Sequence, residues 1–347
     1  MAGPLHGLTV VEMAGIGPAP FACYLLAGLG AAVTRIEAKD RGAVFLPLKA
    51  DTNPDIVMRD IRRIDLKTDD GHGEAIALIA AADVVVEGFR PGVMERLGLG
   101  PDAMLETNPA LIYGRMTGYG QDGPMAARAG HDLNYIALSG VLSMIGRDGE
   151  RPTPPLNLVG DYGGGSMMLI MGILAALFAR QQTGRGCVVD TSMVEGAALL
   201  ATPIFSMIAS GLWQGGRRGR NLLDGGCPFY DTYETADGRY VAVAPLEPQF
   251  FAALVERLGL DEGWTKRQYD RSGWDEMRVL LTTTFRTRSR DDWAAHFADS
   301  DACVTPVLTP QETAAHPHNR ERGSFRAVAD QVMPALGPRF SDQTTDR

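Results

Sequence analysis

The segment Leu8-Thr9-Val10-Val11-Glu12-Met13 has the length and apolar character of a buried strand, and a turn, Gly15-Ile16-Gly17-Pro18-Ala19-Pro20, follows it. A helical pattern then covers residues 21–29 and ends at Gly30, and a second strand pattern covers residues 32–37. Strand, glycine-rich turn, helix and strand in this order predict a βαβ unit with two parallel strands.

The same alternation continues through the first half of the chain. It predicts a helix over residues 71–82 and strands over residues 83–87 and 109–116. Further on it predicts a buried helix over residues 166–183, a strand over 187–190 and a long helix over 193–213. We therefore expect a Rossmann-like α/β domain with an open, mostly parallel sheet. Ligands of such sheets bind beyond the carboxyl ends of the strands.

The pattern changes after the break Gly215-Gly216-Arg217-Arg218. Two strand patterns, residues 229–234 and 240–244, flank Ala236-Asp237-Gly238, which is typical of a hairpin. A smaller α+β domain is therefore expected. The predicted boundaries are 1–200 for the large domain, 201–227 for a helical linker, 228–305 for the small domain and 306–347 for a tail. We expect this tail to return to the large domain or to wrap a neighbouring molecule.

Composition narrows the class of protein. The 347 residues are 45% hydrophobic and 22% charged, with a net charge of −9, which argues against a general electrostatic grip on nucleic acid or an anionic membrane. The longest apolar run, residues 167–179, is too short to span a bilayer. The four cysteines are scattered without metal-ligand spacing, so we expect reduced thiols, no metal site and a cytoplasmic location. The N-terminus lacks the pattern of a signal peptide.

The first glycine turn does not predict a nicotinamide site. Gly15-x-Gly17 lacks the third glycine of the dinucleotide fingerprint. A turn that lets the helix pack closely on the sheet is the favoured explanation of these glycines.

An anionic ligand has candidate partners at strand ends. Residues 33–67 hold eight Lys and Arg against six Asp and Glu, and Arg35 and Arg90 fall in or after predicted strands. Arginine there suits bidentate contact with phosphate. Solvated surface charge is the alternative for each of them.

Three ionisable residues lie at the ends of predicted elements. His131 follows a glycine turn at a predicted helix start, Asp161 lies before Gly163-Gly164-Gly165, and Glu247 opens a helix after the hairpin. Functional residues concentrate at such positions. Local context alone leaves the alternative open that His131 is structural and that the two acids stabilise their helices.

Ordered motifs over about 300 residues carry a resemblance to a known family. They include Glu87-Gly88-Phe89-Arg90-Pro91-Gly92, Gly130-His131-Asp132-Leu133-Asn134-Tyr135, Gly160-Asp161-Tyr162-Gly163-Gly164-Gly165 and Leu246-Glu247-Pro248-Gln249-Phe250. The sequence resembles the α-methylacyl-CoA racemases of the family III CoA-transferase (CaiB/BaiF-like) superfamily. The resemblance implies an epimerase that interconverts (2R)- and (2S)-2-methylacyl-CoA thioesters by two-base proton transfer through an enolate.

The resemblance also assigns roles. His131 and Asp161 would be the two acid/base residues, and Glu247 would hold His131 in orientation. For such a reaction the N–H groups at the helix start after His131, Asp132's among them, are the natural donors to the enolate oxygen. The CoA site would contain Ile16, Arg35, Lys67, Arg90, Gly118 and Tyr135. No cofactor is implied, because CoA is part of the substrate. An interlocked homodimer, with each site built from both chains, is also implied.

Two parts of the chain depart from the family pattern, the loop at 42–58 and the short tail after Ser341. The nearest rival function is a CoA-transferase in which Asp161 is the nucleophile that accepts the acyl group. That chemistry needs neither His131 nor Glu247. A catalytically silent CoA-binding paralogue is a further rival. The preferred acyl chain and the pathway do not follow from the sequence.

Overall fold

A computed structural model describes residues 3–39 and 48–341, which form two compact units. The first unit combines Met1–Val141, Pro155–Thr202 and Pro317–Arg347, and the second combines Leu142–Pro154 with Pro203–His316. Leu142–Pro154, which we expected in the large domain, thus groups with the second unit. Of the loop expected at 42–58, the described part from Leu48 onward consists of turns and irregular chain.

The first unit is built on a six-stranded sheet in which all neighbouring strands are parallel. The strand order is β3 (Asp60–Ile64), β2 (Ala32–Ala38), β1 (Thr9–Met13), β4 (Val84–Glu87), β5 (Ile112–Thr117) and β6 (Val188–Ser192). The chain order reverses at β1, whose neighbours are β2 and β4. A crevice forms at such a switch point, beyond the carboxyl ends of the strands. The predicted α/β class is confirmed.

The edge strand β3 was not predicted. Its sequence, Asp60-Ile61-Arg62-Arg63-Ile64, has exposed charged side chains, and only Ile64 is fully buried. Charged residues are common on edge strands, where they oppose further pairing. An apolar run, the signal that revealed β1 and β4, is therefore absent from this strand.

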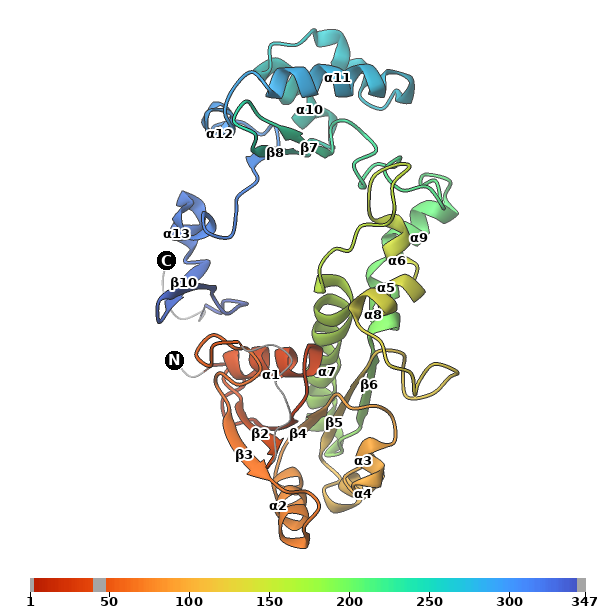
Figure 1. Cartoon of the computed structure of the whole chain (residues 1–347), viewed down its shortest axis with the longest axis vertical. Coiled ribbons are helices and arrows are strands. Elements are labelled where there is room, and N and C mark those ends of the chain that lie inside the picture. The colour runs from red at the N-terminus through yellow and green to blue at the C-terminus, as the bar shows by residue number, and fades with distance from the viewer. Residues whose placement is uncertain (1–2, 40–47, 342–347) are drawn as a thin grey trace. The chain divides into compact units, whose positions relative to one another are not determined.

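Helices cover both faces of the sheet (Figure 1). On one face lie α1 (Pro18–Gly28) and α7 (Met168–Thr183), and on the other lie α2 (Asp69–Ala80), α3 (Val93–Arg96) and α4 (Pro101–Thr107). Alternate side chains of β1 feed the two cores, with Val10 packing on the α1 side and Val11 on the α2 side. Helix α1 begins at Pro18, three residues earlier than predicted, because proline fits the first turn of a helix.

The helix predicted from residue 166 begins earlier and in another geometry. Leu158–Met167 forms a π-helix, η1, that runs directly into α7. Asp161 therefore lies within η1 and not, as predicted, in a loop before a helix. Such wide turns are rare and occur frequently at functional sites.

The long helix predicted over residues 193–213 is wrong as a single element. It is divided into α8 (Met193–Leu200) and α9 (Thr202–Ala209). Pro203 explains the break, because it has no N–H to donate to the preceding turn and its ring would clash with that turn. Two further helices lie between β5 and η1 in the chain, α5 (Asp132–Leu138) and α6 (Val141–Met144).

Helix α8 packs on η1 at very short range through two glycines. A Cβ on Gly196 would lie only 1.8 Å from the carbonyl oxygen of Gly164. A Cβ on Gly164 would lie 2.5 Å from the backbone nitrogen of Ala197. The position of η1, and with it that of Asp161, thus depends on the absence of side chains at this contact.

The helical stretch from η1 through α7 is, by its length of 26 residues and its composition, apolar enough to cross a membrane. In the structure, the buried residues Leu169, Ile170 and Ile173 join the core on the α1 face of the sheet. Packing on the sheet therefore accounts for one side of this helix.

The second unit holds a three-stranded antiparallel sheet covered by helices (Figure 1). Its strands are β7 (Asp231–Glu234), β8 (Tyr240–Val243) and β9 (Val304–Pro306). Besides most of α6 and α9, its helices are α10 (Pro248–Arg257), η2 (Glu262–Arg267), η3 (Arg271–Gly273), α11 (Trp274–Phe285), α12 (Arg290–Phe297) and η4 (Thr313–Ala315). Phe229, Phe251, Trp274 and Phe285 form the centre of its core. The predicted hairpin is confirmed, and β9 pairs with β8 as the third strand.

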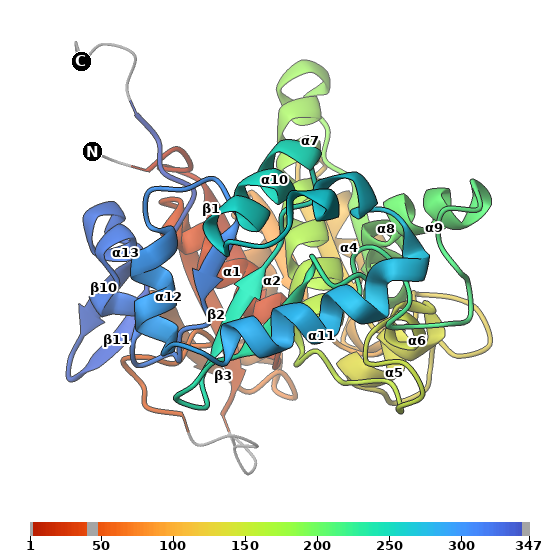
Figure 2. The ribbon, with the colours of Figure 1, turned by 90° about the horizontal axis from the view of Figure 1, so that it is seen from above.

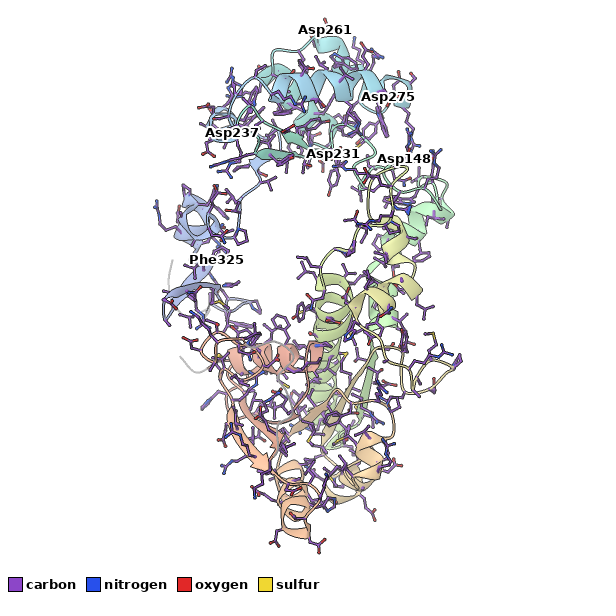
Figure 3. The ribbon with its side chains drawn as sticks, viewed as in Figure 1. Asp148, Asp231, Asp237, Asp261, Asp275 and Phe325 are labelled. Atoms are coloured by element: carbon purple, nitrogen blue, oxygen red, sulfur yellow. The ribbon has the colours of Figure 1, made fainter. Side chains whose placement is uncertain are left out.

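Ion pairs attach Leu142–Pro154 to the rest of the second unit, and Figure 3 labels two of the acids involved. Asp231 forms a salt bridge with Arg147 at 2.7 Å and another with Arg278. Asp148 forms a salt bridge with Arg220 at 2.7 Å. These pairs explain why a segment from the first half of the chain groups with residues beyond Pro203.

The C-terminal segment from Pro317 belongs to the first unit. Helix α13 (Pro317–Arg322) lies beside the hairpin of β10 (Phe325–Val328) and β11 (Gln331–Pro334), as Figures 1 and 2 both show. Leu336 packs against Gly28 so closely that a Cβ on that glycine would lie 2.9 Å from the leucine side chain.

The η1–α8 contact predicts a strong response to one methyl group. We expect Gly196→Ala to lower the free energy of unfolding by about 1–3 kcal/mol, because the backbones must separate. Gly73→Ala is the matched control in α2, where a Cβ meets nothing within 4 Å. It should raise stability by about 0.5–1 kcal/mol. Urea titration of both variants measures this, and an unchanged Gly196→Ala protein would contradict the close contact.

Candidate functional site

A pocket of about 370 Å³ lies at the carboxyl ends of β1, β4 and β5, where the open sheet predicts a ligand. All of its lining residues belong to the first unit. They include Ile16, Gly17, Pro18, Gly88, Phe89, Arg90, Gly118, Tyr119, Arg128, Gly130, His131, Tyr135, Asp161 and Met193. The structure therefore brings His131 and Asp161 to one pocket.

His131 is the N-cap residue of α5, with extended backbone angles. Its backbone N–H donates to the Asn134 side chain at 3.0 Å, which closes the first turn. The preceding turn is held by Tyr135, whose hydroxyl donates to the carbonyl of Gly130. The turn packs closely on both tyrosines, since a Cβ on Gly130 would lie 2.7 Å from the hydroxyl of Tyr119 and 2.8 Å from the ring of Tyr135. The backbone around His131 is thus fixed by local contacts.

Tyr135 stays a neutral donor in this site. Burial, with Tyr119 and Asp161 nearby, raises the pKa of the Tyr135 hydroxyl to about 12. Its ring packs edge-on against Tyr119 at 5.0 Å. The two tyrosines line the pocket together with His131.

Asp161 is half-buried in the pocket wall, and Asn157 donates to its Oδ2 at 3.1 Å. Burial raises the pKa of the Asp161 carboxyl. The hydrogen bond from Asn157 opposes this shift, the charge of Asp132 adds to it, and His131 opposes it. The protonated form of Asp161 thus persists to higher pH than in an ordinary aspartate, as a proton donor requires.

Asp132 is the first residue of α5 and its side chain is buried. The N–H groups at the start of a helix have no acceptor within the helix and carry its positive end. The backbone of Asp132 can therefore donate to a developing negative charge beside His131.

Four of the predicted CoA-site residues line the pocket, namely Ile16, Arg90, Gly118 and Tyr135. Ile16 is 62% exposed, so its side chain is accessible to a ligand in the pocket. Lys67 lies in the turn before α2, where it is exposed and does not belong to the pocket lining.

Arg35 is not part of the pocket lining either. It is only 2% exposed, and it pairs with Glu12 and, at 3.1 Å, with Glu37. Its Nη2 donates to the carbonyl of Gly15 at 3.1 Å. In this structure Arg35 supports the turn that lines the pocket and does not face the pocket itself. The sequence could not distinguish these roles, because it does not tell which face of β2 points where.

Arg59 completes the same network and was not predicted. Its side chain is fully buried, and it donates to Glu12 at 2.8 Å and to the carbonyl of Pro20 at 2.6 Å. Burial raises the pKa of Glu12, and the charges of Arg59 and Arg35 oppose that shift. An acid inside an apolar strand needs a cationic partner, so Glu12 was the signal that could have revealed one. Arg128 in the pocket lining also lacked a sequence signal.

Glu247 lies in the second unit as the N-cap residue of α10. Its side chain is exposed and makes no capping hydrogen bond within the described part of that helix. The structure thus gives no support to the alternative that the Glu247 side chain caps α10. The hydrogen bond expected between Glu247 and His131 stays a prediction.

The fold and the pocket define an α/β protein with a Rossmann-like sheet and a pocket at its carboxyl edge that is lined by His131, Asp161 and Arg90. The model of CoA-transferase family III matches residues 5–347, so the chain belongs to this family.

Relatives cover nearly the whole chain. It is 46% identical over 340 residues to the alpha-methylacyl-CoA racemase of Mus musculus, covering 97% of this chain and 86% of that one. It is 43% identical over 335 residues to the alpha-methylacyl-CoA racemase of Homo sapiens, covering 96% and 86%. The crystal structure of a CAIB/BAIF family protein from Brucella suis superposes with a TM-score of 0.80 at 25% identity, covering 99% and 94%.

The two roles of arginine can be separated by substitution. We expect Arg35→Ala to lower the free energy of unfolding by about 3–5 kcal/mol, because it disrupts a buried ion-pair network. Arg90→Ala is the matched control at the pocket surface. It should change stability by no more than about 0.5 kcal/mol and raise the KM for acyl-CoA. Denaturant titration and steady-state kinetics measure both effects. A stable Arg35→Ala protein with only a raised KM would show that Arg35 contacts the ligand instead.

Proposed function

We propose that this protein is a racemase that interconverts the two epimers of 2-methylacyl-CoA thioesters. One observation carries the proposal: His131 and Asp161 face the same pocket at the carboxyl edge of the sheet. The 46% and 43% identities to alpha-methylacyl-CoA racemases support it.

The proposed reaction moves one proton off, and one proton onto, the carbon next to the thioester carbonyl. His131 takes the proton from one face, the electron pair enters the thioester as an enolate, and Asp161 delivers a proton to the other face. The reverse direction exchanges the roles. One base must be protonated while the other is not, and the raised pKa of Asp161 supports this division.

The enolate oxygen needs hydrogen-bond donors where its charge develops. The free N–H groups at the start of α5, including that of Asp132, lie next to His131 in sequence and provide them. The reaction as proposed uses no metal or nicotinamide, because the thioester itself stabilises the adjacent carbanion.

The CoA part of the substrate is proposed to lie against Ile16, Arg90, Gly118 and Tyr135. Arg90 is exposed in the pocket lining and offers a bidentate contact to phosphate. Arg35 would contribute indirectly, because it donates a hydrogen bond to the carbonyl of Gly15 in the turn that precedes the pocket residue Ile16. A direct role for Lys67 remains a prediction from the family resemblance.

An interlocked homodimer completes the proposal, with Glu247 orienting His131 in the assembled site. Four apolar residues, Met167, Met171, Leu174 and Phe178, recur every three or four residues along η1 and α7 and are exposed in a single chain. This exposed apolar row supports contact with a second copy of the chain. A cytoplasmic location agrees with four free cysteines.

Isotope exchange separates the racemase from its rivals. One 2-methylacyl-CoA epimer is incubated with the protein in deuterated water without an acceptor acid. We expect deuterium at the α-carbon and loss of stereochemical purity. Exchange that starts only when a second carboxylic acid is added would support the transferase. Binding of CoA without any exchange would support a silent paralogue.

Removal of one base should affect the two epimers unequally. We expect His131→Ala to slow α-proton removal from one epimer by about 10²–10⁴-fold and from the other much less, because Asp161 still serves the opposite face. Asp161→Ala should show the opposite preference. His72→Ala, in α2 with its ring bonded to the carbonyl of Leu97, is the control and should exchange both epimers normally. Equal losses for both epimers in His131→Ala would contradict the two-base assignment.

A further inference from the structure

The side chain of Asp132 connects the two elements that carry the proposed bases. It is 6% exposed. Its Oδ1 accepts the backbone N–H of Gly160 at 2.7 Å and that of Asp161 at 2.8 Å. Asp132 itself directly follows His131 at the start of α5. Oδ1 of Asp132 thus links the backbone of Asp161 to the residue that follows His131.

The geometry of η1 explains why this link is available. In a π-helix each N–H donates to the carbonyl five residues earlier, so the first five N–H groups have no partner within the helix. Gly160 and Asp161 are the third and fourth residues of η1. Asp132 therefore acts as a cap supplied from a different helix, and it determines where the first turn of η1 lies.

The contact is built into the sequence at Gly160. A Cβ there would lie 2.5 Å from Oδ1 of Asp132 and 3.1 Å from the side chain of Ile136. Only glycine allows the backbone of η1 to approach the start of α5 this closely. The family motif Gly160-Asp161 thus has a steric basis at its first residue.

A cap alone does not require the second oxygen of Asp132. Oδ2 is buried and has no hydrogen-bond partner among the described residues. The amide oxygen of an asparagine would accept the same two N–H groups without a charge. The negative charge of Asp132 is therefore the feature that the capping geometry does not explain.

That charge acts on Asp161. The titratable groups near Asp161 are Asp132 and His131 from α5, together with Tyr135, which Arg90 also influences. The turn before α1 presents Gly17, and α8 presents Gly196 and Ala197, none of which titrates. Asp132 is the one negative neighbour in this set, and it adds to burial in raising the pKa of Asp161.

We propose that Asp132 is a positioning residue: its side chain fixes the two bases relative to each other, and its negative charge acts on Asp161. This inference rests on the proposed racemase function. It goes beyond the backbone role of Asp132 at the enolate oxygen, because it concerns the carboxylate.

Two substitutions separate position from charge. Asp132→Asn keeps an acceptor for both N–H groups and removes the charge. It should leave the KM for acyl-CoA within about twofold of the parent protein, and it should move the pH at which Asp161 loses its proton to lower values. Protonation of the enolate by Asp161 would then decline at lower pH than in the parent. Asp132→Ala removes the link and should lower kcat for both epimers by about 10²-fold with KM little changed.

The measurement is α-proton exchange of each epimer in deuterated water across a pH series, with thermal unfolding of each variant as a check on folding. Asp83→Ala is the control, because the carboxylate of Asp83 also accepts a backbone N–H, that of Thr9 at 2.9 Å, at the opposite end of β1. It should lower stability and leave the pH profile unchanged.

A parent-like pH profile in Asp132→Asn would overturn the role of the charge, even if Asp132→Ala fails to fold. Unchanged kcat in a folded Asp132→Ala protein would overturn the positioning role. Absence of exchange in the unmodified protein would instead overturn the proposed function, and this inference with it.

Discussion

The carboxylate of Glu12 lies inside β1 with no exposed surface, and the binding end of the sheet depends on its neutralisation. Arg35 and Arg59 both pair with it, and their Nη2 groups donate to the carbonyls of Gly15 and Pro20, respectively. An unpaired charge at this depth would be costly, so the network persists only when all three groups are present. Its consequence is a rigid β1–α1 turn, which forms one wall of the pocket.

The opposite wall depends on the absence of side chains. Gly160, Gly164 and Gly196 let η1 approach α5 and α8 to distances that no other residue permits. Ser166 then bonds the carbonyl of Pro18 at 2.7 Å and joins η1 to α1. The π-helix is thus held on three sides, and Asp161 projects from it at a defined place. Rigid placement of this kind is what general acid–base chemistry requires.

Much of the fold could be predicted because its signals are local. The apolar strands β1 and β4 and the hairpin around Asp237-Gly238 follow from periodicity and turn residues. Strand β3 could not, because its charged edge carries no apolar run. The π-helix could not be predicted either. It depends on tertiary contacts at its glycines, and a run of glycines in the sequence indicates only a turn.

The candidate site was predictable in part. His131, Asp161, Arg90 and Ile16 line one pocket, as expected. Ile16 and Arg90 follow the carboxyl ends of β1 and β4, whereas His131 and Asp161 come from the start of α5 and from η1. Arg35 is inside the sheet instead, since strand direction is known from sequence but the environment of each face is not. Arg59 and the carboxylate of Asp132 have roles that depend on contacts with residues 47 and 29 positions away, which no local pattern records.

The central claim is that two groups on opposite faces of the α-carbon divide the proton transfer. The most direct test follows the first turnovers of one pure epimer in deuterated water and measures deuterium separately in residual substrate and newly formed product. Two bases predict one deuterium per product molecule while the residual substrate remains protiated. Product that retains the original proton would contradict the account, because it would show a single group returning the proton it removed.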